Sequence, residues 1–471
     1  MGSRTRLREK SEANAMRTER DSIGAMELPD DAYYGIQSAR AMENFPLSGS
    51  AMLPEMIESL VQIKKAAARA NGEAGILGAE TAAAIITACD EILQGALREQ
   101  FIVDPVQGGA GTSANMNANE VIANRATELL GGHLGEYRVH PNDHVNMSQS
   151  TNDVFPSAGK LTTLKLLTGL DAALLPLIDA FAQKAREFRD IPKLGRTQLQ
   201  DAVPVRLGQE FNAYGHAIER CRRRLLASRE EMRALNMGAT AIGTSINAPQ
   251  PYLNRVVPLL CEETGMELRQ APDLIEATQN LDGFVEVSAA VKNCALTLSK
   301  IANDLRLLSS GPRGGFEEIH LPARQHGSSI MPGKINPVMP EVVSQVAFRV
   351  AGNDLTIGMA AEAGQLELNA FEPILFHSLF ESIRMLARVA VVFEKYCVRG
   401  ITADEEGCRR NLMNSTAFAT VLCPIIGYEK ATSIVKQALQ ERRQVLDVAV
   451  EQLNRSREEI ERLFDKCISQ C

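Results

Sequence analysis

The stretch LTTLKLLTGLDAALLPLIDAFAQKAREF, residues 161–188, decides the fold class. Its apolar residues recur at i, i+3, i+4 and i+7, which is the spacing of one face of an α-helix. A helix of this length buries little apolar surface alone, so such helices normally pack together in a bundle. The stretch therefore predicts a mainly α protein built around long helices.

The same periodicity returns further along the chain, for example in FVEVSAAVKNCALTLSKIANDLRLLSS, residues 284–310. Alanine-rich stripes in these stretches suggest that each helix packs on more than one face. We expect an oligomer in which bundles from several subunits pair side by side, while a monomeric bundle remains the simpler alternative. The long helices are predicted at 157–188, 206–235, 283–310, 338–362 and 371–397.

The chain on either side of the bundle has a different character, so we predict three domains. Residues 1–148 form a mixed loop and helix domain, with residues 1–16 disordered and the turn-rich stretch 21–35 irregular. The amphipathic stretches 54–75 and 79–97 are predicted helices. Residues 149–405 form the central long-helix bundle, and residues 406–471 form a small C-terminal helical domain.

Composition narrows the class of protein. The 471 residues carry a net charge of -8, which argues against a general nucleic-acid binder. The nine cysteines are dispersed without CxxC spacing, which is typical of reduced thiols in a cytoplasmic protein and argues against zinc. No apolar run looks long enough to span a bilayer, so we expect no membrane partner.

Four polar segments interrupt the apolar pattern and carry the candidate chemistry. Their small hydroxyl and amide side chains suit a carboxylate, which accepts several hydrogen bonds through two oxygens. Helix caps and turns are the better explanation for any one of these segments, but are less persuasive for four in one chain. The segments are GTSANMN at 111–117, HPNDHVNMSQSTND at 140–153, GSSIMPGKINP at 327–337 and, more weakly, GRTQLQD at 195–201.

The segment 327–337 combines backbone freedom with reactive groups. Its glycines permit unusual backbone angles and its prolines limit the alternatives. A serine offers a base or nucleophile, and a lysine offers a cation for a substrate carboxylate. A surface loop with a solvated lysine is the competing interpretation. The residues concerned are Gly327, Ser328, Ser329, Pro332, Gly333, Lys334 and Pro337. The chain lacks a GxSxG elbow and a GKS or GKT phosphate loop, which disfavours a serine hydrolase or a nucleotide-binding loop.

GSSIMPGKINP closely resembles the signature loop of the aspartase/fumarase superfamily. GGAGTSANMNANEVIAN, HPNDHVNMSQSTND, GRTQLQDAVPVRLGQE and DAYYGIQSARAMENF resemble other regions of its aspartase and class II fumarase branch, so the likeness runs from about Arg17 to the C-terminus. SQSTND, together with Gln198 and Glu372 at positions where fumarases usually have histidine and lysine, favours the aspartase side. Some aspartases also carry histidine at position 198, so Gln198 alone decides nothing.

The resemblance implies a three-domain lyase fold with a multi-subunit helical core. It implies a carbon–nitrogen lyase that reversibly removes ammonia from L-aspartate to give fumarate, with a fumarate hydratase or a catalytically inert relative as alternatives. Ser328 matches the general base. The residues matching substrate contacts are Thr112, Ser150, Thr151, Asn152, Thr197, Lys334 and Asn336. The remaining signature-loop residues are Gly327, Ser329, Met331, Pro332 and Gly333.

The resemblance also bears on partners. It implies a small-molecule substrate and a homotetramer in which three subunits build each active site. The elimination requires no cofactor. Activation by a divalent metal is known among aspartases, but the sequence shows no ligand cluster that predicts it, so no metal-binding residue is assigned.

Overall fold

The computed structural model describes residues 15–469, and their contacts divide the chain into two compact units. Unit 1 runs to Leu167 and adds Ser228–Ser288 and Asn353–Glu381. Unit 2 holds Thr168–Ala227, Ala289–Gly352 and the chain from Ser382 onwards. The predicted domain boundaries at 148/149 and 405/406 stay a prediction.

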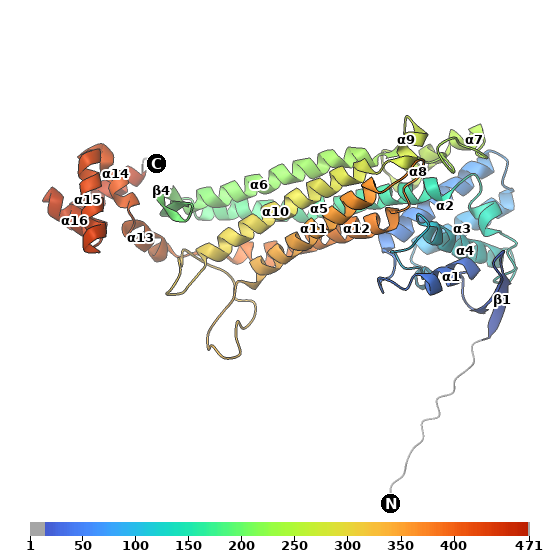
Figure 1. Ribbon diagram of the computed structural model, residues 1–471, viewed down its shortest axis with the longest axis horizontal. Helices are drawn as coiled ribbons and strands as arrows, with labels where there is room; N and C mark the ends of the chain where they lie inside the picture. The colour runs from blue at the N-terminus through green and yellow to red at the C-terminus, as the bar shows by residue number, and fades with distance from the viewer. Residues whose placement is uncertain (1–14, 470–471) are drawn as a thin grey trace, which may run out of the picture. The chain divides into compact units, whose positions relative to one another are not determined.

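The five long helices predicted from the sequence are present and are labelled in Figure 1. They are α5 (Thr151–Glu187), α6 (Leu207–Ser228), α10 (Asp282–Leu308), α11 (Val338–Glu362) and α12 (Glu372–Tyr396). The mainly α fold class is confirmed. The range 206–235 was too long for one helix, because α6 ends at Ser228 and the chain continues into η3 (Arg229–Met232) and β5 (Ala234–Leu235). β5 pairs in parallel with β6 (Arg269–Gln270), which gives its backbone partners outside a helix.

Aromatic residues join these helices within each unit. In unit 1 the Phe376 ring of α12 lies 5.3 Å from the Phe155 ring of α5 and 4.9 Å from the Phe284 ring of α10, centroid to centroid. A Cβ added to Gly159 would lie 2.4 Å from the Phe376 ring, so glycine permits this close approach. In unit 2 the Phe181 ring of α5 lies 6.0 Å from that of Phe211 in α6. Close contacts of this kind define bundle packing.

Helix α5 corrects one expectation about membranes. By length and composition it is apolar enough to cross a bilayer, contrary to the sequence interpretation. However, 56% of its most apolar window is buried inside the chain, and the helix supplies Phe155 and Phe181 to the contacts above. Its apolar side chains therefore serve helix packing.

The N-terminal part of unit 1 contains a hairpin that the sequence did not reveal. Strands β1 (Met16–Arg20) and β2 (Ala25–Pro29) pair antiparallel, so the prediction of an irregular stretch at 21–35 was wrong over β2. Of the predicted disordered segment 1–16, Ala15 is described, Met16 lies in β1, and residues 1–14 lie outside the described residues. Strand β1 reads MRTER and strand β2 reads AMELP, and neither shows the period-two alternation of apolar and polar residues that normally marks a strand.

The helices of unit 1 follow the expected amphipathic pattern, with one exception. α2 (Pro54–Glu73) and α3 (Ala79–Leu93) match their predicted stretches. α4 (Thr112–Leu129) begins inside the polar segment 111–117, which the sequence interpretation treated as an interruption. The NH₂ groups of the buried asparagines there find partners on other segments; Asn117 Nδ2, for example, donates to the Gln100 carbonyl oxygen at 3.0 Å.

Five short helices at the C-terminus pack around a core of their own in unit 2. They are α13 (Glu405–Met413), α14 (Ala417–Ile426), α15 (Tyr428–Glu441), α16 (Val445–Leu453) and α17 (Arg457–Ser469). The rings of Phe418 and Phe464 stack with centroids 4.6 Å apart. Leu194 of strand β3 belongs to the same apolar cluster. These helices therefore rest on the hairpin of β3 (Pro192–Thr197) and β4 (Gln200–Arg206).

The remaining elements are short. In chain order they are α1 (Ile36–Asn44), η1 (Arg98–Gln100), η2 (Pro141–Val145), α7 (Gln250–Leu253), α8 (Val256–Thr264), α9 (Leu274–Gln279), β7 (Ile319–His320), η4 (Val398–Gly400) and β8 (Thr402–Ala403). Strands β7 and β8 pair antiparallel.

Candidate active site

The residues predicted for the site divide between the two units, and each group is described within its own unit. Unit 1 carries Thr112, Ser150, Thr151 and Asn152. Unit 2 carries Thr197 and the signature loop, residues 327–337, with Ser328, Lys334 and Asn336.

The start of α5 is a reciprocal cap. Ser150 Oγ accepts a hydrogen bond from the Asn152 backbone N–H at 3.2 Å, and the Ser150 N–H donates to Asp153 Oδ1 at 2.9 Å. This is the arrangement of a capping box, so this polar segment does cap a helix, as the alternative interpretation of the sequence predicted. The cap also orders the three hydroxyl and amide side chains at 150–152, which is a requirement for a rigid binding site.

Asp153 ties this cap to a second segment of unit 1. The side chain is fully buried, and its Oδ2 accepts the backbone N–H groups of Gly238 at 3.0 Å and Thr240 at 3.2 Å. Burial raises the pKa of Asp153 to about 6, while those backbone hydrogen bonds oppose the shift. Asn152 Nδ2 adds a hydrogen bond of 2.7 Å to the Ala241 carbonyl oxygen. The start of α5 is therefore held from two sides.

A buried lysine lies behind the same segment. Lys64 of α2 is completely buried, and its Nζ donates to Asn146 Oδ1 at 2.8 Å and to Gln149 Oε1 at 3.0 Å. Burial lowers the pKa of Lys64 to about 7, opposed by the Asp153 carboxylate. Sequence analysis missed this residue, although its position four residues after Leu60, on the apolar face of α2, was an available signal.

Asparagine amides connect Lys64 to one of the predicted binding residues. Asn115 Nδ2 donates to Asn146 Oδ1 at 3.2 Å and to Thr151 Oγ1 at 3.0 Å. Asn119 Nδ2 donates to the same Asn146 oxygen at 3.2 Å. We call Lys64, Asn115, Asn119, Asn146, Ser150, Thr151, Asn152 and Asp153 the donor cluster.

Thr112 stands at the first position of α4. Its Oγ1 donates to the Gly109 carbonyl oxygen at 2.8 Å, and the side chain is exposed. The preceding Gly111 has φ +86°, and a Cβ there would lie 2.3 Å from the Phe155 ring. Only glycine satisfies both demands, so Gly111 fixes where α4 begins and where Thr112 is presented.

In unit 2, Thr197 ends strand β3 at the tip of the β3–β4 hairpin. Thr197 pairs with Gln200, and the two turn residues Gln198 and Leu199 have φ values of 54° and 61°. Two successive left-handed residues are typical of the tight turns that match the twist of a hairpin. The hairpin places Thr197 on an exposed, well-defined tip.

A buried ion-pair cluster anchors the chain that leads to the signature loop. The Glu318 side chain has no solvent exposure and contacts Lys193 Nζ at 3.1 Å and an Arg196 guanidinium nitrogen at 2.9 Å. Two cations and several hydrogen bonds compensate the cost of burying this carboxylate. The β3 strand, which carries Thr197, is thereby joined to the segment nine residues before Gly327.

The signature loop closes on itself. The Gly327 N–H donates to the Lys334 carbonyl oxygen at 2.8 Å, and Asn336 Nδ2 donates to the Gly327 carbonyl oxygen at 3.0 Å. Between these points Ser329, Met331, Pro332, Gly333 and Lys334 are exposed. Asn336 therefore has a structural contact that the sequence did not predict, in addition to its expected role.

Ser328 Oγ lies inside this closed loop and accepts two backbone hydrogen bonds. The N–H groups of Ile330 and Met331 both donate to it at 3.1 Å. Hydrogen bonds donated to an oxygen favour its anionic form, so this geometry suits a serine that acts as an alkoxide base.

The histidines His140 and His144 are engaged in the η2 turn. His140 Nδ1 accepts the backbone N–H groups of Asn142 at 3.3 Å and Asp143 at 3.2 Å. His144 Nδ1 accepts the His140 N–H at 2.9 Å. These bonds shape the segment that leads into the donor cluster.

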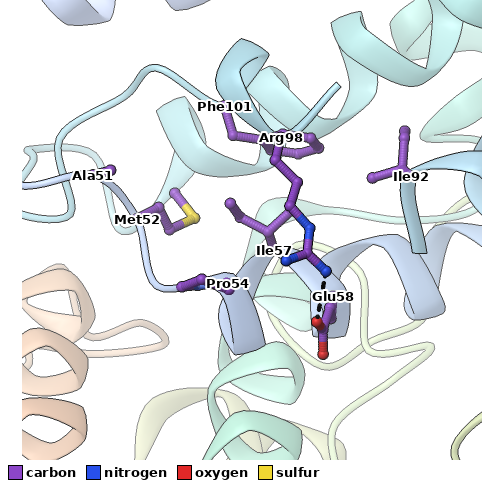
Figure 2. A pocket seen from close by; sticks show the side chains of 8 residues that line it. All are labelled: Ala51, Met52, Pro54, Ile57, Glu58, Ile92, Arg98 and Phe101. Carbon is purple, nitrogen blue, oxygen red and sulfur yellow. Dashed lines mark hydrogen bonds and ion pairs between the residues drawn. The ribbon is translucent and has the colours of Figure 1, made fainter. Parts of the chain in front are cut away.

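A small cavity of about 160 Å³ opens elsewhere in unit 1 (Figure 2). Its floor is apolar, and at its edge an Arg98 guanidinium nitrogen lies 3.3 Å from Glu58 Oε1. None of the predicted site residues lines it. Among residues 15–469, no group of three or more histidine, cysteine, aspartate or glutamate side chains is arranged to hold a metal ion.

Comparison with known proteins places this geometry in a family. Residues 24–352 match a family model described as lyase, and residues 418–466 match one described as fumarase C C-terminus. An aspartate ammonia-lyase of a Bacillus species is 52% identical over 90% of this chain and 91% of its own length. An aspartate ammonia-lyase of Helicobacter pylori is 50% identical, with 95% and 97% covered.

Solved structures agree with the sequence relatives. A structure from Brucella melitensis described as fumarate lyase:delta crystallin bound to cobalt superposes with a TM-score of 0.93, at 49% identity, covering 97% of this chain and 99% of that one. A class II fumarase from Schistosoma mansoni superposes with a TM-score of 0.90, at 32% identity, covering 96% and 98%. With the signature loop, the long helices and these relatives in agreement, the chain belongs to the lyase family that contains the aspartases and class II fumarases.

Proposed function

We propose that this chain catalyses the reversible elimination of ammonia from L-aspartate to give fumarate. The observation that carries the proposal is the serine of the signature loop, whose hydroxyl oxygen already accepts two backbone N–H groups. The aspartate ammonia-lyase relatives, at about half identity over nearly the whole chain, support this substrate.

The chemistry requires a base and strong charge stabilisation. The β-carbon of aspartate is a weak acid, and removing its proton pushes negative charge onto the neighbouring carboxylate, which becomes an enediolate. Ser328 takes that proton as an alkoxide. The enediolate then re-forms its carboxylate and a carbon–carbon double bond while the C–N bond breaks and ammonia leaves.

Neutral donors and one cation hold the charged substrate. Thr112, Ser150, Thr151, Asn152 and Thr197 supply hydroxyl and amide groups for the carboxylates and the amine, and Lys334 and Asn336 hold the α-carboxylate. Donors aimed at charge that develops in the transition state are worth about 3–4 kcal/mol each when they are removed singly. Closure of the signature loop over the substrate excludes water and completes the site.

A homotetramer with sites built by three subunits belongs to the same proposal. The supporting observation is a row of large apolar side chains on α11 that are exposed in the single chain. Phe348, Leu355 and Met359 are 65–67% exposed and recur at spacings of seven and four residues, on one face of the helix. Such rows commonly mark interfaces between subunits. Sedimentation of the active enzyme as a monomer would contradict this assembly.

Fumarate hydration is the second candidate, because a class II fumarase shares the fold at 32% identity. The discriminating experiment follows fumarate absorbance after the protein is mixed with aspartate and, separately, with malate. Fumarate formation from aspartate, with malate turned over far more slowly, supports the proposal. Rapid turnover of malate without turnover of aspartate would replace it with the hydratase.

The elimination proposed here requires no cofactor, since the base and the charge-stabilising groups come from the chain. Activity should therefore survive extensive treatment with a metal chelator. A complete loss of aspartate turnover, restored by a divalent cation, would show that this part of the proposal is wrong.

A further inference from the structure

Lys64 has no place in the mechanism above, yet it is the one lysine of the donor cluster and its side chain is completely buried. A buried lysine is costly unless its donors are used. The acceptors of its Nζ hydrogen bonds, Asn146 Oδ1 and Gln149 Oε1, belong to the segment that leads into α5.

We infer that Lys64 is a positioning residue, which orients the Thr151 hydroxyl as a hydrogen-bond donor toward the substrate by fixing the amides of Asn146 and Asn115 in turn. The inference rests on the proposed function, because it assigns Thr151 to a substrate carboxylate. It adds Lys64 to that site, a residue that lies outside the four polar segments identified from the sequence.

The orientation follows from donor and acceptor chemistry. Lys64 Nζ donates one hydrogen bond to Asn146 and one to Gln149, so the Asn146 atom that faces Lys64 at 2.8 Å is the carbonyl oxygen. The Asn115 atom that faces this oxygen at 3.2 Å must then be its NH₂ group. Lys64 thereby decides an amide orientation that the shape of an asparagine side chain leaves open.

The last step sets the role of the hydroxyl. The NH₂ group of Asn115 also lies 3.0 Å from Thr151 Oγ1, which therefore accepts a hydrogen bond. A hydroxyl has one hydrogen, and when its oxygen accepts from behind, that hydrogen is left to be donated forward. With the opposite Asn115 orientation, Thr151 would instead donate to Asn115 and offer the substrate only an acceptor.

Two unsatisfied atoms mark the cost of this orientation. Asn115 Oδ1 and Asn119 Oδ1 are buried and make no hydrogen bond among the residues that the structure describes. Each amide directs its NH₂ group at Asn146 Oδ1. An unsatisfied buried oxygen is unfavourable, so something must compensate it. The hydrogen bond that Lys64 donates to the shared oxygen stabilises this orientation.

The test is a double-mutant cycle of Lys64→Met and Thr151→Val on the full-length enzyme, with kcat and KM for aspartate measured separately. We expect each single variant to lower kcat/KM by roughly 10- to 100-fold, as for loss of a hydrogen bond to a charged group. In the Thr151→Val background, Lys64→Met should add less than about threefold. A merely structural role would give losses that multiply, and that result would overturn the inference.

Lys65 provides the matched control. It is the next residue on α2, and its Nζ pairs with Asp90 at 2.8 Å and Glu263 at 2.6 Å, away from the donor cluster. Lys65→Met removes the same charge and should leave kcat/KM close to that of the wild type. An equal loss in both lysine variants would show that α2 acts only as a scaffold.

A second pair of variants covers the case in which Lys64→Met does not fold. Asn115→Asp and Asn119→Asp each place a carboxylate opposite Asn146, but only residue 115 contacts Thr151. Asn115→Asp should lower kcat/KM at least tenfold more than Asn119→Asp does, since an aspartate at 115 would accept a hydrogen bond from the Thr151 hydroxyl. Equal losses would contradict the inference. Two failures can be told apart. If the wild-type enzyme does not convert aspartate to fumarate, the proposed function is wrong. If the wild-type enzyme is active but the losses of the two single variants multiply in the double variant, only the role of Lys64 is wrong.

Discussion

The donor cluster of unit 1 and the signature loop of unit 2 serve one proposed reaction but are built in opposite ways. Asn115, Asn119 and Asp153 are at most 1% exposed, and their polar atoms are held by side chains and backbone from several segments. In the signature loop, Ile330 is 84% exposed and the observed hydrogen bonds run within the loop itself. The donor cluster is pre-organised by its surroundings, while the loop that carries the proposed base is exposed and held by its own hydrogen bonds.

This contrast has an energetic meaning. A rigid donor array stabilises developing charge without reorganisation, which is the larger part of catalysis in such sites. A base on a loop that closes over substrate is placed only when substrate is present, which also excludes water. Variants in the two regions should therefore fail in different ways.

The largest effect is expected at Ser328. Ser328→Ala removes the base, and kcat should fall by about 10²–10⁴-fold. Because the hydroxyl is not needed to hold the carboxylates, fumarate should still bind with nearly wild-type affinity in calorimetry. Ser329→Ala, one residue along, is the control and should lose much less activity. Near-normal turnover of Ser328→Ala would refute the assignment.

An intermediate effect is expected at the closure of the signature loop. A Cβ on Gly327 would lie 2.5 Å from the Lys334 carbonyl oxygen, so Gly327→Ala breaks the loop closure. We expect kcat to fall on the order of tenfold with little change in melting temperature, because the loop is not part of a core. Gly333→Ala meets open space at φ +77°, so only backbone strain of about 1 kcal/mol opposes it. If Gly333→Ala proved the more damaging, closure through Gly327 would not matter.

The smallest effect concerns stability and pH in the donor cluster. The pKa of Lys64 is lowered from 10.5 to about 7 by burial, so between these values the unfolded chain binds a proton that the folded chain lacks. The stability contributed by Lys64 is therefore present at high pH and is lost as pH falls through about 7. The melting temperature of wild type minus that of Lys64→Met should increase by a few degrees from about pH 6 to about pH 9.

The neighbouring Lys65 again serves as the control. Burial lowers its pKa, but hydrogen bonds to Asp90 and Glu263 outweigh this, and the pKa is raised above its usual value. Its contribution should not vary over that pH range. The melting-temperature difference between wild type and Lys65→Met should therefore stay constant with pH. If it changed with pH as the Lys64→Met difference does, the titration of Lys64 would not be the cause.

The sequence predicted the long helices because their period of 3.6 is repeated over many turns, which averages out local noise. It also pointed to Ser328 and its loop, since an eleven-residue motif can be identified from the sequence without knowing any contact. It did not predict the strand β2, whose five residues AMELP do not alternate apolar with polar, or the helical start at Thr112, where local asparagine content outweighed burial.

Lys64 shows the deeper limit. A lysine in an amphipathic helix usually extends its charge to solvent, and only the tertiary fold reveals that this one meets two amide oxygens. The proposed site meets the same limit. Residues 112, 151, 197 and 328 are far apart in the chain, and no local pattern encodes whether their side chains act together.

The stack of Phe418 on Phe464 has a practical consequence at the far end of the chain. Leu194 shares that apolar cluster, and the Thr416 backbone N–H donates to Asp201 Oδ2 at 3.1 Å across to strand β4. The last helices thus brace the hairpin tip that presents Thr197. Removing the chain from residue 464 onwards would therefore loosen Thr197, a proposed substrate contact more than 260 residues upstream in the sequence.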